Sequence, residues 1–159
     1  MRNIRLITVG KLKEKYLSQG CAEYLKRLSA FARVQVIEID EARLPDRPSQ
    51  AQIDAALALE GEKILDKAHG SALIALCIEG EIFSSEQLAA RLDALEVQGA
   101  GAMSLIIGSS FGLADAVKKA AVVRLSFSRM TFPHQLMRLL LCEQLYRACS
   151  ISAGGKYHK

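Results

Sequence analysis

The segment "SALIALCIEG", residues 71–80, decides the fold class of this chain. Its apolar run is nearly continuous, which is typical of a strand that a parallel sheet buries on both faces. The segment "AMSLIIG", residues 102–108, has the same character. Around both runs, apolar residues recur at the spacing of amphipathic helices. The pattern predicts an α/β fold.

Further strands and helices alternate along the whole chain. We expect strands at residues 3–10, 34–40, 71–80, 102–108 and 122–127. We expect helices over residues 13–31 and 49–68, from Ser84 or Ser85, near Ala114, and after Pro133 in a first helical turn. This order predicts a mainly parallel sheet with helices on both faces. The length suits a single domain over residues 1–159.

Composition and charge limit the class of protein. Half of the residues are hydrophobic and only three are proline, which favours a soluble globular chain. No apolar run reaches the roughly 18 residues of a membrane span, and the first residues read as a strand rather than a signal peptide. We therefore expect a cytoplasmic protein without membrane contact. The net charge of +4 is compatible with a solvated surface and with an anionic partner.

The four cysteines show no metal-binding spacing, so we expect no metal site. Cys142 and Cys149 lie seven residues apart on one expected helix, about 10 Å along its axis, which is too far for a disulfide. Buried free thiols are the expected state.

Three loops are expected at the edge of the sheet where ligands bind. In open α/β sheets this edge holds the carboxyl ends of the strands. The loops are "CIEGE" (77–81), "GSSFG" (108–112) and "SFSRMTFP" (126–133). Gly108 would let a ligand approach the backbone closely, although a purely structural turn remains an alternative. The turn matches neither a P-loop nor the dinucleotide-binding glycine motif.

The last expected helix is apolar over a wide arc, formed by Leu136, Met137, Leu140, Leu141, Leu145, Ala148 and Cys149. Core packing and a homodimer contact are both open interpretations of this arc. Arg138 and Arg147 are expected on other faces of the helix. RNA contact is one interpretation for them, and a solvated surface or pairing with Glu143 is the other.

Several segments together resemble one known family. They are "ITVGKLKEKYLSQGCAEYLKRL" (7–28), "LIIGSSFGL" (105–113), "LSFSRMTFPHQLMRLLLCEQLYRACSI" (125–151) and the terminal "YHK" (157–159). From end to end, the chain resembles the ribosomal RNA large-subunit methyltransferase H family of the SPOUT superfamily. The resemblance implies S-adenosylmethionine-dependent methylation of N3 of a pseudouridine in 23S rRNA, on the large subunit or ribosome, by a homodimer. It also implies a trefoil knot in the C-terminal part.

The resemblance further implies which residues bind the cofactor: Leu76, Gly108, Phe127, Ser128, Arg129, Met130, Thr131 and Phe132. The apolar members would enclose the adenosine. The chain departs from the family at Ser109, where a second glycine is usual. We expect Gly108→Val to abolish cofactor binding while the fold stays intact.

The same resemblance directs attention to the C-terminal tail. His158 is the candidate base, with Arg138 and Lys159 as electrostatic helpers. The candidate RNA-binding residues are Arg138, Arg147, Tyr157, His158 and Lys159. The tail follows a glycine pair and carries no aliphatic anchor, so we expect it to be dispensable for stability.

Two other functions remain open. One is a non-catalytic RNA-binding or ribosome-binding module of the same fold, which would not bind S-adenosylmethionine. The other is a small-molecule methyltransferase, whose substrate affinity would be insensitive to salt.

Overall fold

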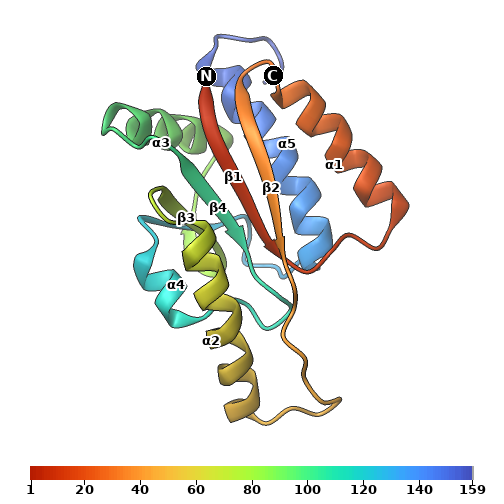
Figure 1. The fold of residues 1–159 in the computed structure, drawn as a ribbon. Coiled ribbons are helices and arrows are strands. Elements are labelled where there is room, and N and C mark those ends of the chain that lie inside the picture. The colour runs from red at the N-terminus through yellow and green to blue at the C-terminus, as the bar shows by residue number, and fades with distance from the viewer. Residues whose placement is uncertain (159) are drawn as a thin grey trace.

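The computed structural model describes residues 1–158, and its centre is a five-stranded sheet (Figure 1). The elements in chain order are β1 (Arg2–Val9), α1 (Lys15–Leu28), β2 (Ala32–Ile39), α2 (Gln50–Lys67), β3 (Ala72–Ile82), α3 (Ser85–Val97), β4 (Met103–Ile107), α4 (Asp115–Ala120), β5 (Val123–Ser126) and α5 (His134–Ser152). All five expected strands are present, with bounds shifted by at most two residues.

Every neighbouring pair of strands is parallel, in the order β2-β1-β4-β3-β5. The order places β4 between β1 and β3, so that this strand is covered on both edges and both faces. All five of its residues are buried. The prediction of an α/β fold with a parallel sheet is therefore confirmed, and the apolar run at 102–108 reflects the central position of β4.

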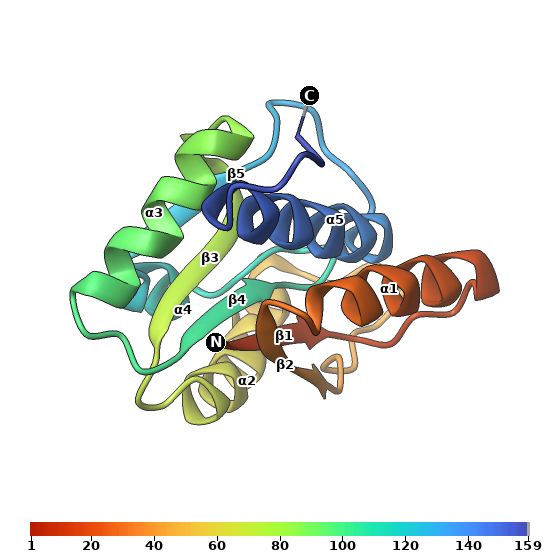
Figure 2. The ribbon, with the colours of Figure 1, turned by 90° about the horizontal axis from the view of Figure 1, so that it is seen from above.

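Helices cover both faces of the sheet (Figure 2). Alternate residues of a strand point to opposite faces, so Leu6 and Ile7 of β1 enter different cores. Leu6 packs with residues of α1, α3 and α5, such as Leu145. Ile7 packs with Ile64 of α2 and Val117 of α4. The two cores hold the helices in place on either side of the strands.

α5 lies between α1 and α3 and supplies much of the larger core. Leu141, Leu145, Ala148 and Cys149 are fully or almost fully buried, which confirms core packing for this part of the apolar arc. Leu140 is only half-buried. The expected position of Pro133 was wrong by one residue, because Pro133 is the N-cap and helical geometry begins at His134.

β3 does not end at Gly80, as the sequence suggested, but continues to Ile82. Leu76 and Glu81 both pair with Leu125 of β5, so the residues between them bulge out of the sheet. A Cβ on Gly80 would lie 2.8 Å from backbone atoms of Arg124, which explains the glycine. The segment 77–81, which was expected to be a loop after the strand, therefore belongs to a bulge within β3, and the strand pairs with β5 on both sides of that bulge.

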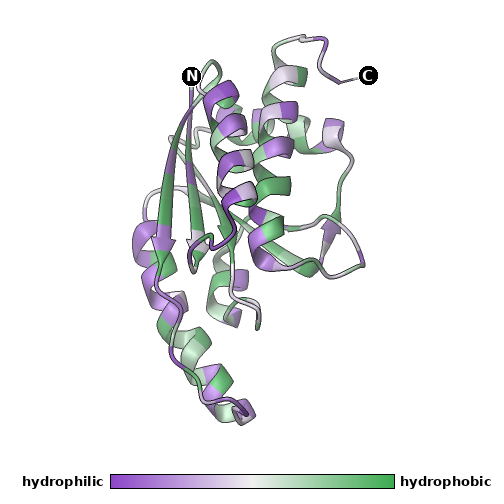
Figure 3. Cartoon of the chain, turned by 90° about the vertical axis from the view of Figure 1, so that its right-hand side faces the viewer, coloured by the Kyte–Doolittle hydropathy of each residue, from purple (hydrophilic) through white to green (hydrophobic). Residues whose placement is uncertain are grey.

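Figure 3 shows both hydrophilic and hydrophobic residues on the helices that face the viewer. Within residues 1–158, no helix is both long and apolar enough to cross a bilayer.

The four cysteines are free, as expected. Cys77 differs from the other three because it is only half-buried.

Candidate functional site

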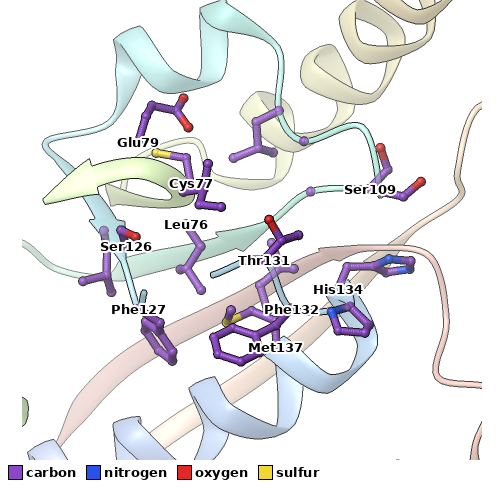
Figure 4. Close-up of a pocket in the computed structure, with 18 of the residues that line it drawn as sticks. Leu76, Cys77, Glu79, Ser109, Ser126, Phe127, Thr131, Phe132, His134 and Met137 are labelled. Carbon is purple, nitrogen blue, oxygen red and sulfur yellow. The ribbon is translucent and has the colours of Figure 1, made fainter. Parts of the chain in front are cut away.

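A cavity of about 680 Å³ opens at the carboxyl edge of the sheet (Figure 4). Its walls are the β3 bulge, the loop from β4 to α4, and the loop from β5 to the first turns of α5. These are the three loops at which the sequence predicted a ligand site. The volume lies within the range of small-molecule and cofactor pockets.

The structure brings seven of the eight expected cofactor residues to this cavity: Leu76, Gly108, Phe127, Ser128, Met130, Thr131 and Phe132. Arg129 is the exception, because it is exposed and is not among the lining residues. Met130 is 75% exposed at the rim. The apolar wall is therefore formed mainly by Leu76, Phe127 and Phe132.

Gly108 is required by the protein itself. A Cβ at this position would lie 2.7 Å from the carbonyl carbon of Gly112, against the oxygen of the same group, and 2.9 Å from a methyl group of Leu113. Real Cβ atoms do not approach backbone so closely. The expectation that Gly108→Val leaves the fold intact is therefore wrong for this loop, since the loop has to move to admit any side chain.

Ser109 fits the turn without strain. No residue other than glycine has a positive φ among the described residues, so its Cβ is tolerated. Its hydroxyl accepts a hydrogen bond from the N–H of Phe111 at 3.3 Å, and its carbonyl accepts one from Gly112 at 2.9 Å. Gly112 itself has a φ of 90°, which favours glycine. The departure from the usual glycine pair is thus compatible with the loop.

The C-terminal tail folds back onto α5. The ring of Tyr157 packs edge-on against Tyr146, with centroids 4.7 Å apart, and the Arg147 guanidinium lies 4.6 Å from its centroid. Its hydroxyl donates to Glu143 at 3.2 Å. Burial, a hydrogen bond with Tyr24 and the charge of Glu143 raise the pKa of Tyr157 to about 12. The expectation of a tail without a stabilising anchor is wrong, because Tyr157 is the anchor.

His158 is held between two helices. Its Nε2 lies 2.6 Å from the Glu86 carboxylate in the first turn of α3, and its Nδ1 lies 3.4 Å from Arg147. Backbone hydrogen bonding at Glu86, together with His158 and Ser84, lowers the pKa of Glu86 to about 2. Arg147 also forms two hydrogen bonds with Glu143, which is the pairing that the sequence left open. Lys159 lies outside the described residues.

The tail and the cavity contact different stretches of α5. No residue after Met137 lines the cavity within the described chain. Glu143, which contacts Tyr157, is six residues further along, or about 9 Å of helix rise. Figures 1 and 3 show the C-terminus towards the far end of α5. Within one protomer, the structure does not bring His158 to the cofactor residues.

Comparison with known proteins identifies the family. The sequence model described as "Predicted SPOUT methyltransferase" matches residues 2–158. A ribosomal RNA large subunit methyltransferase H from Bacillus pumilus is 52% identical over 158 residues, which cover 99% of each chain. A protein of the same name from Leuconostoc mesenteroides is 51% identical over 159 residues, with equal coverage. The chain belongs to the methyltransferase H family of SPOUT enzymes.

A solved structure has a similar fold. A probable methyltransferase from Bordetella pertussis Tohama I superposes with a TM-score of 0.58 at 15% identity, over 93% of this chain and 96% of the other. At this identity the likeness concerns the fold.

Within residues 1–158 of this SPOUT methyltransferase, no three side chains are grouped to hold a metal ion.

Several cavity residues were not identified from the sequence. Cys77 lines the cavity, and burial raises the pKa of its thiol. Glu79 and Lys118 form an ion pair at 2.5 Å, and the hydrogen bond from Lys118 lowers the pKa of Glu79. His134 also lines the cavity. Cys77 and Glu79 lie in the loop at 77–81 that the sequence predicted at the ligand edge, although neither residue was singled out, and His134 begins a helix directly after another of these loops. Lys118 carried no comparable signal.

Arg138 is a buried structural residue in this SPOUT methyltransferase. It is only 6% exposed, and it donates to the Glu38 carboxylate at 2.8 Å and to the Gly10 carbonyl at 3.0 Å. Its guanidinium faces β2 and the end of β1 rather than solvent, so this structure leaves Arg138 no exposed surface for an RNA contact. Its two contacts instead fix the loop that follows β1.

Replacing Arg138 by methionine is expected to lower the free energy of unfolding by roughly 2 kcal/mol. The change leaves the Gly10 carbonyl and the partly exposed Glu38 without their partner, at similar side-chain volume. Urea unfolding measures the effect. Arg33→Met, at an exposed position of β2, is the control and should change the stability little. Equal stabilities of the two variants would contradict the role of Arg138.

Proposed function

We propose that this SPOUT methyltransferase transfers a methyl group from S-adenosylmethionine to N3 of a pseudouridine in 23S rRNA, within the large subunit or the assembled ribosome. The proposal rests mainly on the cavity, where seven of the eight expected cofactor residues come together from three loops. The full-length relatives that carry the methyltransferase H name support the substrate class. A ribosomal substrate implies a cytoplasmic protein.

The cavity residues fit the cofactor chemically. Leu76, Phe127 and Phe132 offer apolar surface for an adenosine, and the loop backbones offer hydrogen-bonding groups for its polar edges. When bound, S-adenosylmethionine supplies a methyl group activated by its sulfonium charge. The protein walls exclude water and fix the orientation of the ligands, which contributes several kcal/mol to lowering a barrier. We also propose that the three loops form the trefoil knot expected for the family.

His158 is the proposed acceptor of the pseudouridine N3 proton. In the tautomer whose Nε2–H donates to Glu86, the lone pair lies on Nδ1, and the carboxylate orients the ring. In this structure that lone pair accepts from Arg147 at 3.4 Å, so the guanidinium has to leave Nδ1 before the proton transfers, and it then offers positive charge near the N3 anion. Tyr157 and Arg147 are proposed to contact the RNA at their remaining exposed surface, and Lys159, the next residue in the sequence after His158, is proposed to contribute a further positive charge.

We propose that the protein acts as a homodimer in which the tail of one protomer faces the cavity of its partner. The separation of His158 from the cavity within one protomer supports this arrangement. The half-buried Leu140, on the outer part of the α5 apolar arc, supplies contact surface. Leu141 does not, because it is completely buried within its own protomer.

Leu140→Glu is expected to convert the dimer to monomers at micromolar concentration. A charge in a dimer contact is costly to desolvate, whereas the same glutamate remains hydrated in a monomer. Sedimentation equilibrium measures the mass. Val97→Glu is the control, because Val97 is 88% exposed at the end of α3, and it should leave the mass unchanged. An unmodified protein that is monomeric, or a dimeric Leu140→Glu, would rule out this contact.

The function itself is tested with ribosomes purified from cells that lack this protein. Purified protein and S-adenosylmethionine carrying a tritiated methyl group should label 23S rRNA, and mass mapping should place the methyl group on a pseudouridine. Calorimetry should detect S-adenosylmethionine binding. Absent binding would indicate the non-catalytic module. Binding without rRNA labelling would favour a small-molecule methyltransferase.

A further inference from the structure

Three lysines follow β1 at the carboxyl edge of the sheet. Lys11, Lys13 and Lys15 are exposed, and none of them forms an ion pair within residues 1–158. Glu14 lies within this segment, and Asp40 and Glu41 follow β2 beside Gly10. Within residues 11–15 themselves, three lysines stand against one glutamate, so this segment carries an excess of positive charge.

The backbone that carries these lysines is fixed at both ends of the turn. The N–H of Gly10 donates to Ile39 at 2.7 Å, and its carbonyl accepts from the buried Arg138 at 3.0 Å. The N–H of Lys13 donates to the Gln135 side chain in the first turn of α5 at 2.9 Å. Leu12 packs against the larger core. The loop therefore presents its cations from a defined position.

The same contacts place the loop next to the cavity. A Cβ on Gly10 would lie 3.9 Å from Nε2 of His134, and His134 lines the cavity. Gln135, the next residue of α5, holds Lys13. A nucleotide entering the cavity from this side brings its flanking phosphates towards the lysines.

We propose that the loop at residues 11–15 binds the phosphate backbone of the RNA beside the nucleotide that is methylated. This inference rests on the proposed function, and it assigns RNA binding to residues other than the tail. Lysine ammonium groups bind phosphates as point charges, without reading the base sequence. The loop therefore contributes affinity and register rather than choice of base. Arg138 acts only indirectly, by holding Gly10.

The test compares two double variants with equal loss of charge. Lys11→Ala/Lys13→Ala removes two cations beside the cavity. Lys26→Ala/Lys67→Ala removes two exposed cations from the last turns of α1 and α2, at the opposite edge of the sheet. Methyl transfer to ribosomes that lack the modification is measured between about 50 and 200 mM salt. Calorimetry with S-adenosylmethionine and thermal unfolding verify that both variants are folded.

We expect Lys11→Ala/Lys13→Ala to raise KM for ribosomes roughly tenfold near 150 mM salt, with kcat and cofactor affinity unchanged. The dependence of log KM on log salt should lose about 0.7–0.9 per lost phosphate contact. The control should match the unmodified protein. If both variants keep the same KM and salt dependence while the unmodified protein methylates rRNA, the inference alone is overturned. Absence of rRNA methylation by the unmodified protein would overturn the proposed function and this inference together.

Discussion

Gly108→Ala is expected to lower the affinity for S-adenosylmethionine roughly 5- to 150-fold. The added Cβ meets the carbonyl group of Gly112, so the loop between β4 and α4 has to move away from its present path. Overpacking of this kind costs about 1–3 kcal/mol, and a strain of this size in the bound form lowers the affinity by that factor. Because the loop is one wall of the cavity, the strain acts on the binding site directly.

Calorimetry with purified protein measures the loss, and urea unfolding measures the accompanying loss of stability. Gly101→Ala is the matched control, because a Cβ there meets nothing within 4 Å and the residue lies just before β4, at the other end of the strand. The control should bind the cofactor normally. Cofactor affinity of Gly108→Ala within twofold of the control would mean that this loop is not part of the site.

His158→Ala is expected to lower kcat for rRNA methylation by roughly 10²–10⁴, the usual contribution of a general base. His158→Gln should be equally slow, because its amide can contact Glu86 but cannot take up a proton. The KM for S-adenosylmethionine should not change in either variant, since His158 lies outside the cavity. Lys156→Ala, an exposed neighbour, is the control. Normal turnover in His158→Gln would exclude the base role and leave only a structural one.

Mixed dimers test whether the tail acts across the dimer. Protomers with His158→Ala keep an intact cavity, and protomers with Gly108→Ala keep an intact tail. If each tail serves the partner's cavity, a mixed dimer contains one complete site and recovers activity that neither variant has alone. If each tail serves its own cavity, both sites of the mixed dimer are defective. Recovery above the level of the separate variants decides between the two arrangements.

The elements buried on both sides were predictable from the sequence. The run at 102–108 is apolar because β4 lies inside the sheet, where all five of its residues are buried. The run at 71–80 correctly predicted the strand β3 but not its burial, because only Ile74 and Ala75 of β3 are buried. The bulge in β3 was not predictable. It depends on how Leu125 of β5 pairs with both Leu76 and Glu81, and no local pattern encodes such a pairing. The sequence shows a glycine at position 80, but it does not show that the backbone of β5 lies against this residue.

The candidate site was also predictable only in part. The position of Gly108 in a turn after a buried strand pointed to the cavity wall, because the carboxyl edge of a parallel sheet is a general ligand site. The environment of Arg138 could not be deduced, because its partner Glu38 lies 100 residues away and on another element. The docking of the tail was missed for a similar reason, since Tyr157 is anchored by Tyr146 rather than by residues of its own segment.

The place of β4 between β1 and β3 has a consequence for biosynthesis. β1 ends at Val9, whereas β4 begins only at Met103 and α5 follows later still. At about 5–20 residues per second, roughly 5–20 s separate the emergence of the two strands from a ribosome. During that time one edge of β1 and the apolar face of α1 lack their partners and are open to chaperones or to other nascent chains. The core of this protein can close only when translation of its last helix is complete.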